Sequence, residues 1–326
     1  MQIIDRRALL VGVGAAAAAT LAAQAAAGRT RPGLFARLRQ PIGLQLASLG
    51  MEAGRDIDAT FARLAQIGYR EIELPNLLGH QPAELAAAAS RAGLTIVSLH
   101  LPLMAMGGAG GLSLLSEPAR IADTMGTLKA KWAVAPILLF PTNFRPTPGE
   151  ALEATIARTI AAAGEDIWKR TAELLNNKGE ALRPLGIGVA YHNHNLDFAP
   201  IAKAGGGATT GWEILSKETQ PALVGFEVDI GWVELAGLDP VLFLQSMRGR
   251  IKLLHVRDIA ATQPSGYRIA MGSPIVGSGR LNWARILPAA YRAGARHFLV
   301  EQEPQPGIAP LEAAGKAFAY LSQLPA

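Results

Sequence analysis

The sequence predicts an α/β protein, a single (β/α)8 TIM barrel that follows an N-terminal export signal. Two observations predict this fold: eight short apolar runs alternate with helical patterns, and chemically active side chains stand at the ends of six of those runs. Alternating strands and helices are typical of a parallel sheet, and eight such units close a barrel. A doubly wound open sheet is the alternative, but no glycine-rich phosphate turn follows the first run.

The first 27 residues have the pattern of a twin-arginine export signal. Arg6 and Arg7 precede an Ala- and Gly-rich stretch, and Ala25 and Ala27 offer small residues for cleavage. The stretch is poor in large apolar residues and short for a membrane span, although an Ala-rich helix of the fold or an uncleaved anchor are alternative interpretations. We therefore expect a signal peptide over 1–27, a linker over 28–40 and the barrel over 41–326. The mature protein would be periplasmic or otherwise exported, without stable membrane insertion.

The composition argues against a nucleic-acid-binding protein. The chain has 326 residues, half of them hydrophobic, and a formal net charge of +5. Much of that charge is local, because four arginines crowd the segment before the first strand and no basic stripe with interleaved aromatic residues follows. The chain has no cysteine, so it forms no disulfides. A domain of this length buries a large single core.

The predicted strands are short apolar runs, in order along the chain. They cover 42–47, 70–75, 94–100, 134–140, 187–193, 224–230, 251–257 and 297–302. Helical patterns lie between them over 56–68, 82–93, 150–177, 239–247 and 281–294. Capping residues mark several helix ends, with N-caps at Asp56, Asp239 and Asn282 and C-terminal glycines at Gly68, Gly93 and Gly294.

Ionisable residues gather where these strands end. Chemistry in a TIM barrel takes place at the C-terminal ends of the strands, and a purely structural barrel needs no such groups there. His80 precedes a helix and His297 begins the last strand, so both are interpreted as structural. The residues at the strand ends are Glu73, His100, His192, His194, Asp229, His255 and Glu301.

Side-chain alternation along the strands selects the inward-facing members of this set. Side chains two residues apart share a face of a strand, as His192 does with His194 and Asp229 with Glu227. Two imidazoles and two carboxylates suit Mn²⁺, Co²⁺, Zn²⁺ or Fe²⁺ better than Ca²⁺, and suit Mg²⁺ less well. The pattern therefore predicts one divalent metal ion, held by His192, Asp229, His255 and Glu301.

Several motifs resemble the xylose isomerase-like TIM barrels known as sugar phosphate isomerases/epimerases, and in particular an exported subgroup with a YHNH motif. The resemblance runs from Ile42 to the C-terminus and is carried by "VAYHNHNLDF", "GWEILSKETQPALVGFEVDIGWVELAGLDP", "IKLLHVRDI", "GSGRLNW" and "FLVEQE". It implies metal ligands on strands five to eight, at the same four residues that alternation selects. It also implies that Glu73 and His100 line the substrate pocket.

The resemblance implies a sugar isomerase or epimerase that removes a proton next to a carbonyl through a metal-stabilised ene-diolate. Many members of the family carry a glutamate at the strand-five position, where this chain has His192. A dehydratase or lyase that eliminates from a keto-sugar or a 3-keto-glycoside is therefore the main alternative. We expect Glu301 to act as ligand and base, and His194 or His100 as the second acid or base.

Two further residues are expected near the substrate. Trp232 is a candidate for stacking on a sugar face, with plain packing as the alternative. Arg257 is a candidate for contacting an anionic group, with a salt bridge to Asp258 or a helix as the alternative.

The expected partner is a small sugar or glycoside. Phosphorylated sugars are mainly cytoplasmic and no phosphate-binding motif is present, so an unphosphorylated substrate is expected. The sequence leaves open whether the chain forms a homo-oligomer. A non-catalytic sugar-binding protein and an abasic-site endonuclease are the remaining alternatives, but the endonuclease would need more metal ligands and a basic groove.

Overall fold

The computed structural model describes residues 32–104, 111–140, 144–145, 148–203, 206–269 and 272–325. The predicted signal peptide, residues 1–27, lies outside the described residues. Within the range predicted as a linker, α2 (Leu34–Leu38) forms a short helix whose Leu34 and Phe35 are buried. Phe35 packs edge-on against Phe298 of the last strand, with ring centroids 5.6 Å apart. These residues are therefore part of the packed domain.

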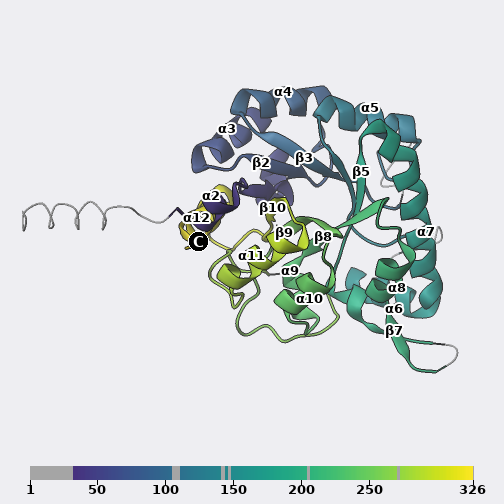
Figure 1. The fold of residues 1–326 in the computed structure, drawn as a ribbon. Helices are drawn as coiled ribbons and strands as arrows, with labels where there is room; N and C mark the ends of the chain where they lie inside the picture. Colours follow the sequence, from purple (N-terminus) through teal and green to yellow (C-terminus); the bar gives the residue numbers. More distant parts are fainter. Residues whose placement is uncertain are drawn as a thin grey trace, which may run out of the picture.

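The eight predicted strands form one closed parallel barrel, as expected (Figure 1). Its strand order is β1-β10-β9-β8-β5-β4-β3-β2, which excludes the open doubly wound sheet. A small antiparallel hairpin, β6 (Pro200–Ala202) with β7 (Ala208–Thr210), stands outside the barrel beside α8. The barrel strands are β1 (Gly43–Gln45), β2 (Glu71–Leu74), β3 (Thr95–His100), β4 (Trp132–Ala135), β5 (Gly188–His192), β8 (Val224–Asp229), β9 (Ile251–Val256) and β10 (His297–Val300).

Helices surround the barrel, and the predicted caps are in place. Asp56 accepts a hydrogen bond from Ala59 N at 2.9 Å, and Asp239 accepts from the first backbone N–H groups of α10. The main helices are α3 (Ile57–Ile67), α4 (Pro82–Ala92), α5 (Pro118–Leu128), α6 (Leu152–Ala163), α7 (Glu165–Leu182), α8 (Gly211–Glu218), α9 (Ile230–Leu235), α10 (Pro240–Ser246), α11 (Trp283–Ala293) and α12 (Pro310–Gln323).

Two predicted elements differ from the observed ones. The fourth strand covers 132–135 rather than 134–140, because Pro136 has no N–H to donate to a strand ladder. The predicted helix over 150–177 is two helices, α6 and α7, because Gly164 leaves the helical region with φ 57° and ψ −137°. The chain therefore turns sharply where a single long helix was expected.

The inside of the barrel is layered. A separate small cluster of buried apolar side chains fills its interior: Val97, Val134, Ala190, Leu253 and Leu299. Ala190, Leu253 and Leu299 each stand two residues before a predicted ligand, so they share that ligand's face of the strand. The polar strand ends therefore rest on an apolar layer, as is typical of a packed barrel rather than a pore.

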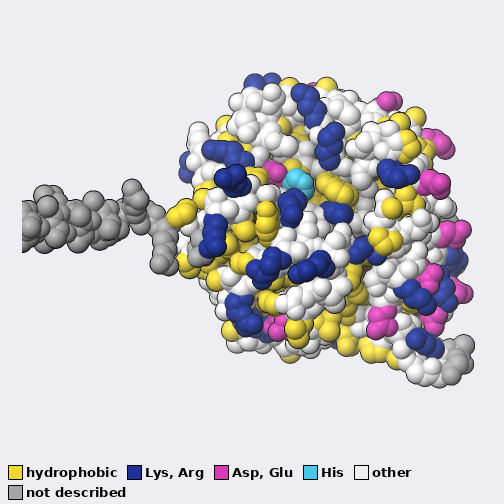
Figure 2. Space-filling model, viewed as in Figure 1, with side chains coloured by type: hydrophobic (Ala, Val, Ile, Leu, Met, Phe, Trp, Pro, Cys, Tyr) yellow, Lys and Arg dark blue, Asp and Glu magenta, His cyan; other side chains and the backbone are white. Residues whose placement is uncertain are grey.

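The surface has no continuous basic stripe on the face drawn in Figure 2. Lys and Arg side chains are dispersed over this face with uncharged surface between them, while Asp and Glu side chains gather toward α7. Among the described residues, no helix is both long and apolar enough to cross a membrane.

Candidate metal centre

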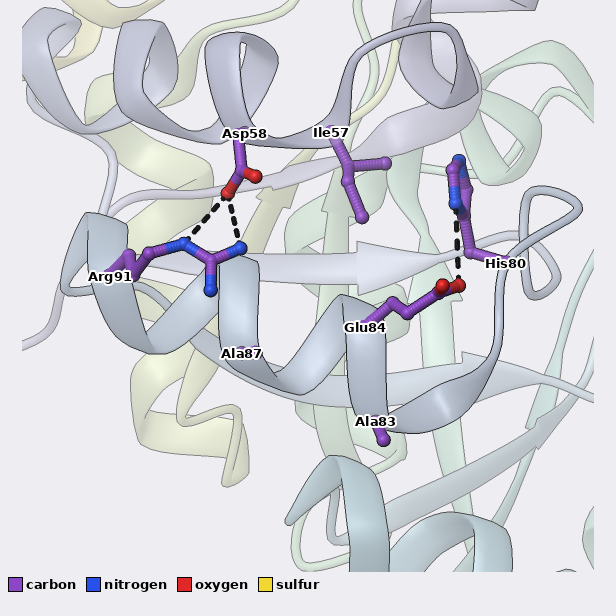
Figure 3. A pocket seen from close by; sticks show the side chains of 7 residues that line it. All are labelled: Ile57, Asp58, His80, Ala83, Glu84, Ala87 and Arg91. Atoms are coloured by element: carbon purple, nitrogen blue, oxygen red, sulfur yellow. Dashed lines mark hydrogen bonds and ion pairs between the residues drawn. The ribbon is translucent and has the colours of Figure 1, made fainter.

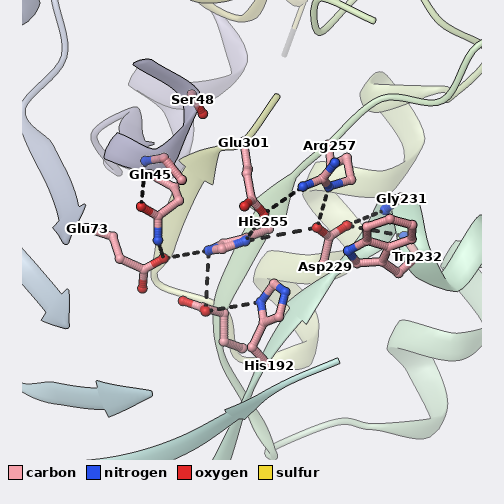
Figure 4. Close-up of polar contacts among 12 residues, drawn as sticks. Gln45, Ser48, Glu73, His192, Asp229, Gly231, Trp232, His255, Arg257 and Glu301 are labelled. Atoms are coloured by element: carbon pink, nitrogen blue, oxygen red, sulfur yellow. Dashed lines mark hydrogen bonds and ion pairs between the residues drawn. The ribbon is translucent and has the colours of Figure 1, made fainter. Parts of the chain in front are cut away.

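The barrel brings the four predicted ligands together at the mouth formed by β5, β8, β9 and β10 (Figure 4). One ligand atom from each lies within 4.8 Å of the others. His255 Nδ1 lies 2.7 Å from Glu301 Oε2 and 4.0 Å from Asp229 Oδ2. His192, Asp229 and His255 are buried, whereas 14% of the Glu301 side chain is exposed. The geometry is therefore compatible with the predicted ligand set, and its role stays a prediction.

Asp229 ends β8 and also begins α9. Its Oδ1 accepts hydrogen bonds from Gly231 N at 2.8 Å and Trp232 N at 3.2 Å, which caps the helix. Its Oδ2 accepts from Arg257 Nε at 2.8 Å. The helix cap thus fixes the carboxylate and leaves Oδ2 directed at the centre.

Asn193 joins the two strands that carry His192 and Asp229. Its side chain donates to Asp229 O at 3.2 Å and accepts from Asp229 N at 2.9 Å. These two bonds continue the β5–β8 pairing beyond His192, where the backbone ladder has ended. Asn193 therefore has a structural part in setting the spacing between two predicted ligands.

Glu73 lies beside His255, to its left in Figure 4, and is fully buried. It accepts hydrogen bonds from Gln45 Nε2 at 2.6 Å and Ser98 Oγ at 2.5 Å. Its Oε1 also lies 2.7 Å from His255 Nε2. With its oxygens engaged from within the barrel, Glu73 is placed to orient the His255 ring rather than to line an open pocket.

Glu227 is a buried candidate residue of the site that the strand-end argument did not select. It is fully buried, and its Oε2 lies 3.0 Å from His100 Nε2 and 3.3 Å from both His192 Nδ1 and His255 Nε2. With those three histidines it forms a second group with metal-ligating atoms within 4.8 Å of one another. The signal was present in the sequence, because Glu227 shares the inward face with Asp229, but its position inside the strand concealed it.

Burial and neighbouring charges have different net effects on the pKa values of His100 and His194, the two candidate acids. Burial alone would lower the pKa of His100, but the charge of Glu73 and the hydrogen bond with Glu227 outweigh it and raise the pKa to about 10. Burial and the nearby His192 hold the pKa of His194 well below its usual value. The pKa values of the two rings are therefore shifted in opposite directions, upward for His100 and downward for His194.

Arg257 is held by three carboxylates, none of which is Asp258, the alternative partner considered from the sequence. Its guanidinium contacts Asp229, lies 3.2 Å from Glu301 Oε2, and pairs with Glu303. Burial would lower its pKa, yet the charges of Glu301 and the other two carboxylates raise it. The group remains charged beside the predicted metal ligands.

Trp232 is only 2% exposed. The Arg257 guanidinium lies over its ring at 4.8 Å, and the His194 ring lies 5.4 Å from it. The indole therefore packs within the site wall, and its predicted stacking on a sugar is not supported by this placement.

The residues at the centre fit a divalent cation. Five carboxyl groups face a single guanidinium and three buried imidazoles, which leaves an excess of acidic groups that a dication would offset. His192 Nδ1 is buried, and it lies 3.3 Å from the carboxylate of Glu227. The carboxyl groups are Glu73, Glu227, Asp229, Glu301 and Glu303.

The two histidines interpreted as structural lie away from this centre. His297 pairs with Glu71 at 3.0 Å at the start of β10, at the opposite end of the barrel. His80 lines a surface cleft of about 440 Å³ between α3 and α4, where it lies 3.7 Å from Glu84 (Figure 3). Both placements agree with the sequence interpretation.

A closed parallel barrel with buried histidines and carboxylates converging at the strand ends defines a TIM barrel with a candidate metal site. Residues 61–324 match the model of the Xylose isomerase-like TIM barrel family, and the chain belongs to that family.

Individual proteins and solved structures are also similar to the chain. An inosose dehydratase from Lacticaseibacillus casei is 30% identical over 172 residues, which cover 48% of this chain and 54% of the relative. The chain thus spans about half the length of this curated relative. A sugar phosphate isomerase/epimerase from Parabacteroides distasonis ATCC 8503 is 27% identical, covers 88% of this chain and 94% of that one, and superposes with a TM-score of 0.68. The structure of an IOLI protein with a bound zinc atom shares the fold, at 15% identity, 86% and 98% coverage and a TM-score of 0.56.

Proposed function

We propose that the chain is a metal-dependent enzyme that removes a proton next to the carbonyl of an unphosphorylated sugar or sugar-like ring. One observation carries the proposal: His192, Asp229, His255 and Glu301 each direct a ligand atom to one point at the strand ends.

These four residues would hold one divalent cation. Their mixed nitrogen and oxygen set favours Mn²⁺, Co²⁺, Zn²⁺ or Fe²⁺, and Mg²⁺ less. When bound, the cation would supply a Lewis acid that polarises the carbonyl and stabilises developing negative charge.

Glu301 is the proposed base. Burial would raise its pKa, but the charges of Arg257 and His255 outweigh burial and hold the pKa well below its usual value. It is therefore ionised at neutral pH, and its partly exposed carboxylate is accessible to a substrate. His100 has the opposite property, a protonated ring at neutral pH, so it is the proposed acid. His194, neutral and adjacent, is the alternative proton carrier.

Two outcomes follow from the same first step. Return of the proton to the neighbouring carbon gives isomerisation, and return to the same carbon from the opposite face gives epimerisation. In elimination, the C–H electron pair forms a C=C bond, and the β-oxygen leaves with its electron pair and takes a proton from the acid.

A specific observation favours elimination. A symmetric epimerase needs two carboxylates across the substrate, and the family resemblance implies that the second one would stand where this chain has His192. The curated relatives are inosose dehydratases, which also favours elimination.

Metal analysis combined with deuterium exchange tests the proposal. Purified chain would be assayed in D2O with 3-keto and unmodified sugars, with and without added Mn²⁺, Co²⁺ or Zn²⁺. We expect deuterium to enter a substrate carbon, or an unsaturated product to form, only with metal. No bound metal together with full activity in Asp229→Ala and His255→Ala would reject the proposal.

We also propose that the protein is exported by the twin-arginine route, on the strength of Arg6, Arg7 and the Ala-rich segment that follows. N-terminal sequencing of the mature protein from a periplasmic fraction tests this. A mature chain that begins near residue 28 is expected, and a chain that retains Arg6 and Arg7 in the cytoplasm would contradict it.

A further inference from the structure

A cavity of about 400 Å³ opens beside His100, between the ends of β2 and β3. It shares His100 with the inward-facing cluster, unlike the cleft over α3 and α4 shown in Figure 3. Its lining residues are Pro75, Asn76, Leu77, Leu99, His100, Leu101, Pro102, Gly111 and Leu112.

The lining of this cavity is predominantly apolar. Four leucines and two prolines form most of it, Asn76 is exposed at its edge, and His100 is its one ionisable lining residue. The α3–α4 cleft, by contrast, is lined by Asp58, Glu84 and Arg91. Ligand sites typically combine an apolar surface with a few polar groups at one end, which is the composition found here.

His100 connects the cavity to the candidate metal centre. Its Nε2 lies 3.0 Å from both Glu73 and Glu227, so this nitrogen is directed into the barrel. Its ring is stacked on the His255 ring, with centroids 5.9 Å apart and an interplanar angle of 17°. The cavity therefore begins one imidazole away from a predicted ligand.

The volume of the cavity sets the size of its occupant. A dry cavity of roughly 150 Å³ holds a benzene ring, so this cavity has room for one or two aromatic rings. A sugar hydroxyl placed against the leucines would lose its hydrogen bonds to water without replacement, which disfavours a second sugar.

We propose that this cavity binds an apolar aryl substituent of the substrate, so that the substrate is an aryl glycoside or its keto derivative rather than a free sugar. The proposal rests on the proposed function for the orientation of the sugar: the sugar lies at the metal centre and its substituent extends past His100. Apolar surface buried in the cavity then contributes affinity that a methyl glycoside lacks.

Binding of two matched probes tests the proposal. 4-Nitrophenyl β-D-glucopyranoside and methyl β-D-glucopyranoside would be titrated into the metal-loaded full-length chain by calorimetry. We expect the aryl glycoside to bind at least ~10-fold more tightly. Saturation-transfer NMR should show the strongest transfer to the aryl protons.

Variants of the cavity lining test whether the preference for the aryl glycoside arises in this cavity. Leu77→Asn and Leu112→Asn place a polar group in the lining at partly buried positions, so the chain should still fold, and both should reduce the aryl preference to below ~3-fold. Leu242→Asn is the matched control, because Leu242 is 64% exposed on α10 and should leave the preference unchanged. Equal binding of the two probes, or an aryl preference that survives both lining variants, would overturn the proposal.

The deuterium-exchange assay keeps the two proposals separate. If the chain catalyses metal-dependent exchange on a keto-sugar but binds the two glycosides equally well, only the cavity proposal would be rejected. An aryl preference that depends on Leu77 and Leu112, without any exchange, would support the cavity and reject the proposed reaction.

Discussion

Two buried aspartates at neighbouring strand ends have opposite surroundings. Asp229 ends β8 and Asp258 follows β9, and both are completely inaccessible to solvent. Asp258 accepts five hydrogen bonds, all from uncharged N–H groups of the segment that follows it: Ile259 N, Leu281 N, Gly277 N, Gly279 N and Trp283 Nε1.

The carboxylate of Asp229 has a different set of partners from that of Asp258. Two backbone N–H groups bind one of its oxygens, while the other faces Arg257 and His255. Burial raises its pKa, against the opposing charge of Arg257. Burial alone therefore does not distinguish a structural carboxylate from a candidate ligand. The difference lies in whether neutral donors take up both oxygens or leave one directed at a cluster.

Removal of Asp258 should have the largest effect on stability. Asp258→Ala leaves five buried donors without a partner, at ~1–3 kcal/mol for each donor that water cannot reach, so we expect a loss of ~3–5 kcal/mol in the free energy of unfolding. Denaturant unfolding measures it. Metal affinity of the folded protein should change by less than a few-fold, and a variant with unchanged stability but no metal would reverse the two assignments.

Asp229→Asn should show the opposite pattern. The amide oxygen can still accept from Gly231 N and Trp232 N, so the helix cap and the fold persist, while metal affinity falls by at least ~100-fold. Calorimetric Mn²⁺ or Co²⁺ titration measures this.

Asp239→Asn is the matched control for that variant, because Asp239 caps α10 through the same two-donor arrangement at the surface. Unchanged metal binding in Asp229→Asn would exclude Asp229 as a ligand.

Replacement of Glu73, which contacts His255 Nε2, should have an intermediate effect on metal affinity. In Glu73→Gln the partner of His255 Nε2 loses its charge, and substitutions of such supporting groups typically weaken metal binding ~10–100-fold. Glu71→Gln is the control, since Glu71 lies two residues earlier on β2 and pairs with His297 at the far end. If Glu73 instead binds substrate, Glu73→Gln would raise KM and leave metal affinity unchanged.

Alternation along strands predicted the candidate centre because it is a local property of each strand. It placed His192, Asp229, His255 and Glu301 on one face, and barrel closure then determined that the four meet. The depth of Glu73 and the contacts of Glu227 with His100 depend on how opposite sides of the barrel approach each other, which no single strand reveals.

Other differences between the predicted and the observed structure have identifiable physical causes. The partners of Asp258 come mostly from residues about twenty positions later, so "HVRDI" alone shows no reason for a buried aspartate. The break at Gly164, in contrast, was visible in the sequence, because a glycine followed by Glu165 and Asp166 is typical of one helix ending and another beginning.

A third buried carboxylate should make the stability of the fold depend on pH. Asp197 Oδ2 accepts from Tyr191 Oη and His194 N, both at 3.0 Å, whereas its Oδ1 has no partner among the described residues. Burial raises its pKa to about 8. The native state therefore binds a proton that the unfolded state, with an aspartate pKa of ~3.9, has already released between about pH 4 and pH 8.

The free energy of unfolding should accordingly fall as pH rises through this window and level off above pH 8. Asp197→Asn lacks the titrating group, so wild type should lose ~4 kcal/mol more than the variant between pH 5 and pH 8.5. Urea unfolding at the two pH values measures the difference. Parallel pH profiles for the two proteins would show that Asp197 is already ionised in the native state.

His255 has one ring nitrogen directed at Glu301 and the other at Glu73. The carboxylates of Glu73 and Glu227 also have hydrogen-bond partners within the chain, so the fold itself holds these side chains in place. The proposed metal site is thus preformed, and an ion would not have to assemble it on binding. On the proposed function, the ion bound would then depend on the relative supply of metals more than on assembly of the site.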